Sequence, residues 1–169
     1  MAAYCGGDAA AFEALYVRHR ARLFRFILRT IKVRATAEEL YQEVWMRVIE
    51  ARRAYKATAR FSTWLYTIAH NRMVDHWRRR GLSLGSLEEQ DVPDPAADPA
   101  RHAEAREALA RFAAALERLP PVQREAFLLH EEAGLTVAEI AAATGSNEEA
   151  AKSRLRYAMA KLKAAIDDE

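Results

Sequence analysis

The most constraining feature of this chain is a pair of helix-start signals near its C-terminus, one on each side of a glycine. Thr136 and Glu139 form the first signal, a hydroxyl followed three residues later by a carboxylate, and Ser146 and Glu149 form the second. Such a capping box satisfies free backbone amides at the start of a helix. Gly145, between the two signals, suits the left-handed turn that ends a helix. The pattern predicts two helices joined by a tight turn at this glycine.

The second of these helices has an apolar face and a charged face. Apolar side chains recur at steps of four, three and four residues, at Leu155, Met159, Leu162 and Ile166. A helix-turn-helix protein reads base edges from the first turns of its second helix and holds phosphates with flanking cations. Four side chains suit these contacts: Ser153 and Arg156 for base edges, Lys152 and Arg154 for phosphates. An ordinary helical hairpin with a solvated charged face is the alternative interpretation.

Helical patterns also fill the N-terminal part of the chain. Asp8 is placed to cap a helix that runs to about Lys32. Thr36 and Glu39 form another capping box, which predicts a following helix. The outer side of that helix is acidic within a basic region and comprises Glu39, Gln42, Glu43, Met46 and Glu50. This composition favours a protein surface rich in Arg or Lys as partner, although a solvated acidic face explains it equally well.

A loop over residues 56–60 leads into a further helix, which the pattern predicts from about Ser62 to Arg80. Aromatic rings lie among cations along this stretch: Lys56, Arg60, Phe61, Trp64, Tyr66, Arg72, Trp77, Arg78, Arg79 and Arg80. Flat rings stack on unpaired bases at roughly 1–3 kcal/mol per base, and cations follow the phosphates. The composition therefore favours single-stranded DNA as a ligand over intact duplex.

The same helix carries a polar stripe beside its apolar one. Asn71, Asp75 and Arg78 lie four and then three residues apart, so they share one face that could meet duplex DNA. For Trp64 and Trp77, core packing is the alternative interpretation, because large aromatic residues are mostly buried.

Charge divides the chain into three parts. Residues 1–80 carry 16 Lys and Arg against 7 Asp and Glu, whereas 101–169 carry 10 against 12. The cationic excess favours a polyanion as partner. Residues 81–100 hold five acids, no base, two glycines and three prolines, which is typical of an extended linker. We expect an all-α chain of two small helical domains, 1–80 and 103–169, joined by a flexible acidic linker, 81–102.

The sequence argues against several other classes of protein. No run of roughly 18 apolar residues is present, and residues 1–10 lack a signal-peptide pattern, so we expect a cytoplasmic protein without membrane insertion. Cys5 is the lone cysteine and has no partner for an internal disulfide or a metal-ligand pair. His70 and His76 do not share a helix face, and His130 lacks the second histidine of a zinc motif. We therefore expect no enzyme activity, no metal and no cofactor.

Several sequence blocks, taken in order, resemble a known family. The blocks at 39–45, 61–71, 78–80, 137–141 and 152–155 read ELYQEVW, FSTWLYTIAHN, RRR, VAEIA and KSRL. Together with Leu119-Pro120 and Gln123-Arg124 they occur in the right order, and the resemblance extends over nearly the whole chain. The chain resembles the extracytoplasmic-function (ECF) sigma factors of the sigma-70 family.

This resemblance implies an RNA polymerase sigma factor that directs promoter-specific transcription initiation. Residues 1–80 then correspond to the sigma-2 domain and 103–169 to the sigma-4 domain, with an anti-sigma factor as regulator. Partners within the polymerase would be the beta flap and the beta-prime coiled coil, the latter contacted by Glu39, Gln42, Glu43 and Met46. Recognition and melting of the −10 element would fall to Lys56, Arg60, Phe61, Ser62, Trp64, Asn71, Asp75, Arg78 and Arg79. Recognition of the −35 element would fall to Glu149, Lys152, Ser153, Arg154, Arg156 and Tyr157.

Two interpretations of function stay open at this point. Glu149 and Tyr157 depart from the common pattern of the family, so the preferred −35 sequence does not follow from the resemblance; Glu149 could accept a hydrogen bond from a cytosine amino group. The alternative to a sigma factor is a stand-alone helix-turn-helix transcription regulator with an N-terminal helical dimerisation or sensor domain. Such a regulator would bind specific duplex DNA without polymerase.

Overall fold

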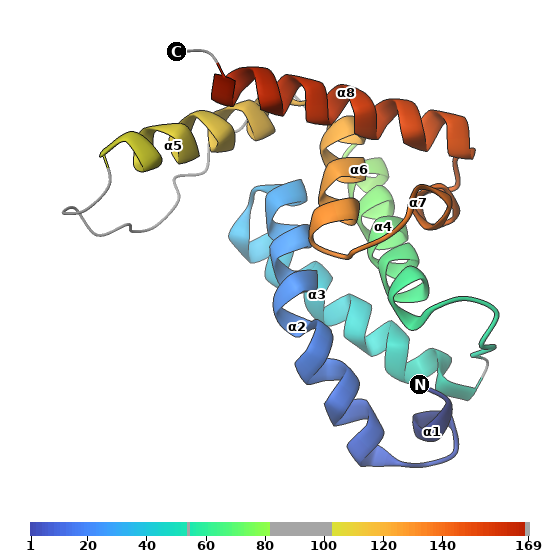
Figure 1. Cartoon of the computed structure of the whole chain (residues 1–169). Coiled ribbons are helices and arrows are strands. Elements are labelled where there is room, and N and C mark those ends of the chain that lie inside the picture. The colour runs from blue at the N-terminus through green and yellow to red at the C-terminus, as the bar shows by residue number, and fades with distance from the viewer. Residues whose placement is uncertain (54, 82–102, 168–169) are drawn as a thin grey trace.

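The protein is described here by a computed structural model that covers residues 1–53, 55–81 and 103–167, and its regular elements are helices (Figure 1). In chain order these are α1 (Ala2–Cys5), α2 (Ala9–Ile31), α3 (Arg34–Glu50), the 3-10 helix η1 (Ala51–Arg53), α4 (Phe61–Arg79), α5 (Ala103–Arg118), α6 (Pro121–Glu131), α7 (Val137–Thr144) and α8 (Glu148–Asp167). The all-α prediction is confirmed. The predicted acidic linker over 81–102 lies outside the described residues, Gly81 apart.

The first long helix forms as its sequence predicts, and the second begins earlier than predicted. The Asp8 carboxylate accepts a hydrogen bond from the Ala11 amide at 3.2 Å, and α2 ends where Lys32 adopts a left-handed φ of 65°. The predicted capping box at Thr36 is wrong, because α3 begins at Arg34. The Ala37 amide already donates to the Val33 carbonyl at 2.9 Å, so the helix is under way before Thr36 is reached.

Helices α2, α3 and α4 pack into a bundle around one apolar interior. Its fully buried side chains include Leu23, Phe26, Ile27, Leu40, Val44, Leu65 and Met73. Trp77 is only 4% exposed, so core packing is the correct interpretation for this ring. Trp64 is only partly buried and lies at the edge of the same bundle.

In the C-terminal part, α5, α6 and α7 each pack against α8. The capping box at α7 is confirmed. The Glu139 carboxylate accepts a hydrogen bond from the Thr136 amide at 2.9 Å, and the Thr136 hydroxyl accepts one from the Glu139 amide at 3.3 Å. Gly145 ends the helix with a φ of 62°. The second predicted capping box is wrong in its residue, because Asn147 and not Ser146 accepts the hydrogen bond from the Ala150 amide, at 2.8 Å.

The buried face of α8 also differs from the predicted one. Leu155 and Leu162 are buried, but Met159 and Ile166 are 40% and 43% exposed. The interior positions between the leucines are Ala151 and Ala158, both fully buried. Small side chains at these positions let the neighbouring helices approach α8 closely.

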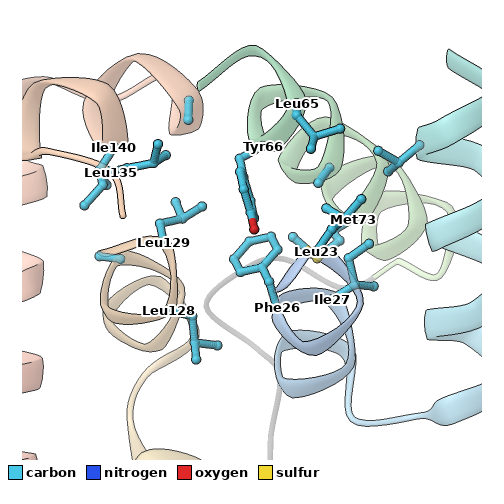
Figure 2. Packing of buried hydrophobic residues seen from close by; sticks show 14 of the residues in the cluster. Leu23, Phe26, Ile27, Leu65, Tyr66, Met73, Leu128, Leu129, Leu135 and Ile140 are labelled. Carbon is cyan, nitrogen blue, oxygen red and sulfur yellow. The ribbon is translucent and has the colours of Figure 1, made fainter. Parts of the chain in front are cut away.

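The N-terminal helices α1–α4 and the C-terminal helices α5–α8 are in direct contact. Helix α6 packs against α2, and α7 packs against α4 (Figure 1). Figure 2 shows Phe26 of α2 and Tyr66 of α4 facing Leu128 and Leu129 of α6. The apolar interior therefore continues from one group of helices into the other, and all four of these side chains are at most 1% exposed.

Candidate nucleic-acid interface

Aromatic rings gather at the N-terminal end of α4. Trp64 lies edge-on to Tyr55, with ring centroids 4.8 Å apart, and 5.9 Å from the centroid of Phe61. Phe61 in turn contacts His19 of α2, at 5.2 Å. Lys56 and Arg60 are exposed beside these rings. We call Tyr55, Phe61 and Trp64 the aromatic cluster; with the two cations it has the composition of a surface for unpaired bases.

The sequence analysis missed two residues at this site, Tyr55 and His19. Tyr55 directly precedes the predicted loop, and its position beside Lys56 was the signal that could have found it. His19 follows the helical spacing of α2, so its sequence position alone did not single it out as a site residue. Burial, followed by the positive charges of the nearby Arg18 and Arg22, lowers the pKa of His19.

Other residues predicted for the −10 element fall into two groups. Ser62 is buried at the start of α4, so its side chain does not lie on the surface. Asn71, Arg78 and Arg79 are exposed further along the helix. The structure thus brings Phe61 and Trp64 together at one end of α4 and the polar stripe at the other.

Asp75 organises the polar stripe of α4. One carboxylate oxygen accepts from Arg72 Nη2 at 2.6 Å, and the other pairs with Arg78 Nη2 at 2.5 Å. Arg78 keeps a side chain that is 77% exposed, so its guanidinium stays accessible to a phosphate. Charge-assisted pairs of this kind fix the orientation of a guanidinium. Asp75 therefore suits a role in positioning the two arginines more than direct contact with DNA.

The charged face predicted on α8 is open to solvent. Glu149, Lys152, Arg156 and Tyr157 are exposed, and Ser153 and Arg154 are partly buried. The Arg156 guanidinium lies 5.2 Å from the centroid of the Tyr157 ring, which favours a cation–π contact. Helix, turn and helix with an exposed, cationic second helix is the arrangement that enters a major groove.

The acidic side of α3 is likewise accessible. Glu39, Gln42 and Met46 are exposed and Glu43 is partly buried, while Leu40 and Val44 face the interior. This side combines carboxylates with an exposed methionine, which suits a protein partner with basic and apolar groups.

The structure reveals polar contacts between the two groups of helices that the sequence analysis missed. Glu139 accepts a hydrogen bond from the Thr63 hydroxyl at 2.9 Å and lies 3.4 Å from the Arg60 guanidinium. Burial on its own would raise the pKa of Glu139, but hydrogen bonds from Thr136 and Thr63, with the charge of Arg60, lower it below its ordinary value. Arg60, a predicted DNA contact, is thus paired within the chain.

Among residues 1–53, 55–81 and 103–167, no group of His, Cys, Asp and Glu side chains is placed to hold a metal ion. The helices in these ranges are too short or too polar to cross a membrane.

Known proteins resemble the chain in sequence. The sigma-70 region 2 family matches residues 15–82, and the sigma-70 region 4 family matches residues 109–162. The RNA polymerase sigma factor CarQ of Myxococcus xanthus is 35% identical over 159 residues, which cover 93% of this chain and 90% of CarQ. The ECF RNA polymerase sigma factor SigK of Mycolicibacterium vanbaalenii is 33% identical over 156 residues, which cover 88% of this chain and 78% of SigK.

A solved structure resembles the chain in fold. It is the sigma factor RpoE from Bartonella quintana, in complex with the anti-sigma factor NepR, and it superposes with a TM-score of 0.75 and 24% identity. The match covers 94% of this chain and 98% of RpoE. Both family matches, the coverage of the sequence relatives and the exposed helix-turn-helix point the same way. The chain belongs to the extracytoplasmic-function sigma factors of the sigma-70 family.

Proposed function

We propose that this sigma factor directs core RNA polymerase to promoters by reading duplex DNA at the −35 element with α8 and capturing melted bases of the −10 element with the aromatic cluster. One observation carries the proposal: a single chain presents an exposed helix-turn-helix face and, on a separate group of helices, half-buried aromatic rings beside exposed cations. The first suits paired DNA and the second unpaired DNA.

The energy for strand opening comes from binding alone in this proposal. Duplex stacking costs a mean of about 1.4 kcal/mol per base-pair step. Stacking of an extruded base on an aromatic ring returns roughly 1–3 kcal/mol, so two or three captured bases offset the opening of a short stretch. No covalent step, metal or cofactor is required, and we propose no enzyme activity for the chain.

Core polymerase is the partner that aligns the two DNA-binding surfaces. Elements 25 base pairs apart are separated by about 85 Å along B-DNA, at roughly 3.4 Å per base pair. A compact chain of this length has a radius of gyration of only about 15 Å. The acidic side of α3 is the surface we propose for the beta-prime coiled coil, and the C-terminal helices for the beta flap. Two weak sites held at a fixed spacing bind far more tightly than either alone.

Regulation by an anti-sigma factor, in the cytoplasm, completes the proposal. RpoE of Bartonella quintana, which shares this fold, was solved with its anti-sigma factor bound. The exposed apolar side chains on the C-terminal helices include Leu109, Tyr157, Met159 and Ile166, and they offer area for such a protein partner.

A transcription assay tests the proposal. The chain is added to core polymerase on a library of random promoter sequences, and the initiated transcripts are sequenced. A shared sequence upstream of the start sites is expected. Trp64→Ala should reduce transcript yield on duplex templates by at least tenfold, and Trp64→Phe, which keeps a flat ring, should retain most of it. No transcripts with a core that is active with another sigma factor would refute the proposal.

The stand-alone regulator is the second candidate, favoured by the exposed α8 face. It predicts specific binding to duplex DNA by the free chain at salt concentrations near 150 mM. Selection of the free chain on the same library, without polymerase, separates the two candidates: enrichment of one duplex sequence supports the regulator, and no enrichment supports the sigma factor.

A further inference from the structure

Helix α1 lies outside the residues that match the sigma-70 region 2 family, which begin at position 15. It packs against α2 and η1 (Figure 1). Tyr4 is its buried side chain, 8% exposed, and the centroid of the Tyr4 ring lies 4.9 Å from that of Phe12. Phe12 in turn meets Trp45 of α3 edge-on, at 5.9 Å. One aromatic ring therefore attaches α1 to the interior of the N-terminal helices.

The turn between α1 and α2 holds Tyr4 in a defined position. The Gly7 amide donates a hydrogen bond to the Tyr4 carbonyl at 3.0 Å. The Asp8 amide donates one to the Ala3 carbonyl at 3.1 Å. Gly7 has a φ of 102°, a conformation that favours glycine. Because Asp8 also caps α2, the placement of α1 is fixed to the start of that helix.

Tyr4 also contacts η1, through a cation. The Arg52 guanidinium lies 5.1 Å from the centroid of the Tyr4 ring, within the range of a cation–π contact. The 3-10 helix η1 has only three residues, and so short a segment has poor hydrogen-bond geometry of its own. Its position relative to the bundle therefore depends on side-chain contacts such as the one between Arg52 and Tyr4.

The aromatic cluster begins just after η1. Tyr55 comes three residues after Arg52, which is at most about 11 Å of extended chain. The Tyr55 ring lies 4.8 Å from the ring of Trp64. Burial raises the pKa of the Tyr55 phenol, and the nearby Cys5 of α1 raises it further, so α1 itself reaches the surroundings of this ring. Contacts therefore lead from α1, through η1 and Tyr55, to Trp64.

The loop over residues 56–60 lies open to solvent between two anchored rings. Its side chains are all exposed, whereas Tyr55 before it and Phe61 after it are partly buried. A displacement of Tyr55 would free the Trp64 ring that it contacts, and a base that stacks there would have to order both rings at the moment of capture. Ordering of flexible side chains opposes binding, so a cluster that is already ordered captures a base more tightly.

From these contacts we infer that Tyr4 and Arg52 are positioning residues for base capture: the ring from α1 and the guanidinium from η1 hold Tyr55, and through it Trp64, in the arrangement that receives an unpaired base. The inference rests on the proposed function, because it assigns a role in the same site. Tyr4 is buried and does not need to touch DNA, so its effect must pass through the aromatic cluster.

Two substitutions remove different parts of the contact. Tyr4→Ala removes the ring that joins Arg52 to Phe12, and with core polymerase on a promoter recovered from the random library it should lower transcript yield about tenfold, which is equivalent to ~1.4 kcal/mol. Arg52→Met removes only the cation–π contact, so we expect a loss of about threefold. Tyr4→Phe keeps a ring beneath the guanidinium and should retain most of the yield.

A matched control and a double-mutant cycle separate positioning from a general loss of stability. The control is Arg53→Met, which removes the same charge from the exposed neighbour of Arg52 and should keep the yield within about twofold. If Tyr4 acts through Trp64, Tyr4→Ala should cost much less in a Trp64→Ala background than in the unmodified chain. Equal losses in the two backgrounds would overturn the inference, because Tyr4 would then act elsewhere.

Acrylamide quenching of tryptophan fluorescence reports the aromatic cluster in the free chain. Trp45 and Trp77 are 5% and 4% exposed, so the partly buried Trp64 should supply most of the quenching. Arg52→Met should raise the quenching constant, and the control variant should not. The rise should disappear in a Trp64→Phe background, and a rise that persists there would count against the inference. If Tyr4→Ala fails to fold by circular dichroism, Arg52→Met, at a partly exposed position, takes its place in the double-mutant cycle.

The two readouts distinguish failure of this inference from failure of the proposed function. Raised quenching with a lower yield that depends on Trp64 supports both. Raised quenching with no transcripts from any variant, the unmodified chain included, supports the positioning of the cluster by Arg52 and refutes the sigma-factor role. Unchanged quenching in Arg52→Met, or raised quenching with full transcript yield, would overturn the inference.

Discussion

Tyr66 provides a quantitative test of the contact between the two groups of helices. Its ring is 1% exposed and lies edge-on to Phe26, facing α6 (Figure 2). Within the described residues its hydroxyl is buried and has no hydrogen-bond partner. Burial also raises the pKa of this phenol well above its ordinary value, so the group stays neutral. Tyr66→Phe removes the hydroxyl and keeps the ring, so the folded chain should become more stable.

The magnitude follows from the solvation of one hydroxyl. In the unfolded chain the phenol is hydrated, and burying such a group without a partner costs about 1–3 kcal/mol. Phenylalanine avoids that cost and leaves at most a small gap where the oxygen was. We expect the free energy of unfolding to rise by about 1 kcal/mol. For a chain of this size, the melting temperature should then rise by roughly 2–4 °C.

Urea unfolding followed by circular dichroism measures the change. Tyr157→Phe is the matched control, because that hydroxyl is on a half-exposed side chain and hydrated in both states; its effect should stay within about 0.5 kcal/mol. A Tyr66→Phe variant that is less stable than the unmodified chain by more than about 0.5 kcal/mol would show that the hydroxyl has a partner, and the packing argument at this interface would fail.

Three further predictions concern single side chains. The pKa of Glu139 is lowered in the folded chain, so the carboxylate stabilises the fold fully above its unfolded pKa of about 4.3, and this contribution is lost as pH falls through the folded pKa. Between pH 6 and pH 3 the melting temperature of Glu139→Gln should therefore fall by less than that of the unmodified chain. Asn147→Ala should lower the free energy of unfolding by about 1 kcal/mol, and Ser146→Ala by less, because only Asn147 caps α8. In the promoter library, Arg156→Ala should change the −35 sequence recovered, whereas Lys152→Ala should weaken all promoters alike and flatten the salt dependence.

Capping signals show how far local sequence predicts this fold. Three pairs with this spacing of hydroxyl and carboxylate were predicted to be capping boxes, and of these only the pair at Thr136 forms one. At Thr36 the preceding turn was already helical. At Ser146 the neighbouring Asn147 took the cap, and the serine hydroxyl instead pairs with Thr144 at 3.0 Å. Sequence identifies the region where a helix begins, but competing acceptors one residue apart differ only in backbone geometry.

The prediction of the apolar face of α8 was wrong for a related reason. Its buried positions follow steps of four, three and four residues, as predicted, but they are Ala151, Leu155, Ala158 and Leu162. Spacing alone selected a set of larger apolar residues that is shifted along the helix from the buried set, because alanine gives a weak hydrophobic signal. Because α5, α6 and α7 approach α8 closely, small side chains fit the buried positions of α8 better than large ones. That approach is part of the tertiary structure, so the sequence of α8 alone does not predict it.

For the candidate site, the sequence predicted which residues take part but not which of them pair with each other. Phe61, Trp64 and Arg60 were found from their order along the chain. The contacts of Arg60 and Thr63 with Glu139 were not found, because these partners lie more than 70 residues apart and each has a satisfactory local explanation. The excess of cations over 1–80 was taken only as a sign of a polyanion, whereas part of it, at Arg25 and Arg29, faces Glu132.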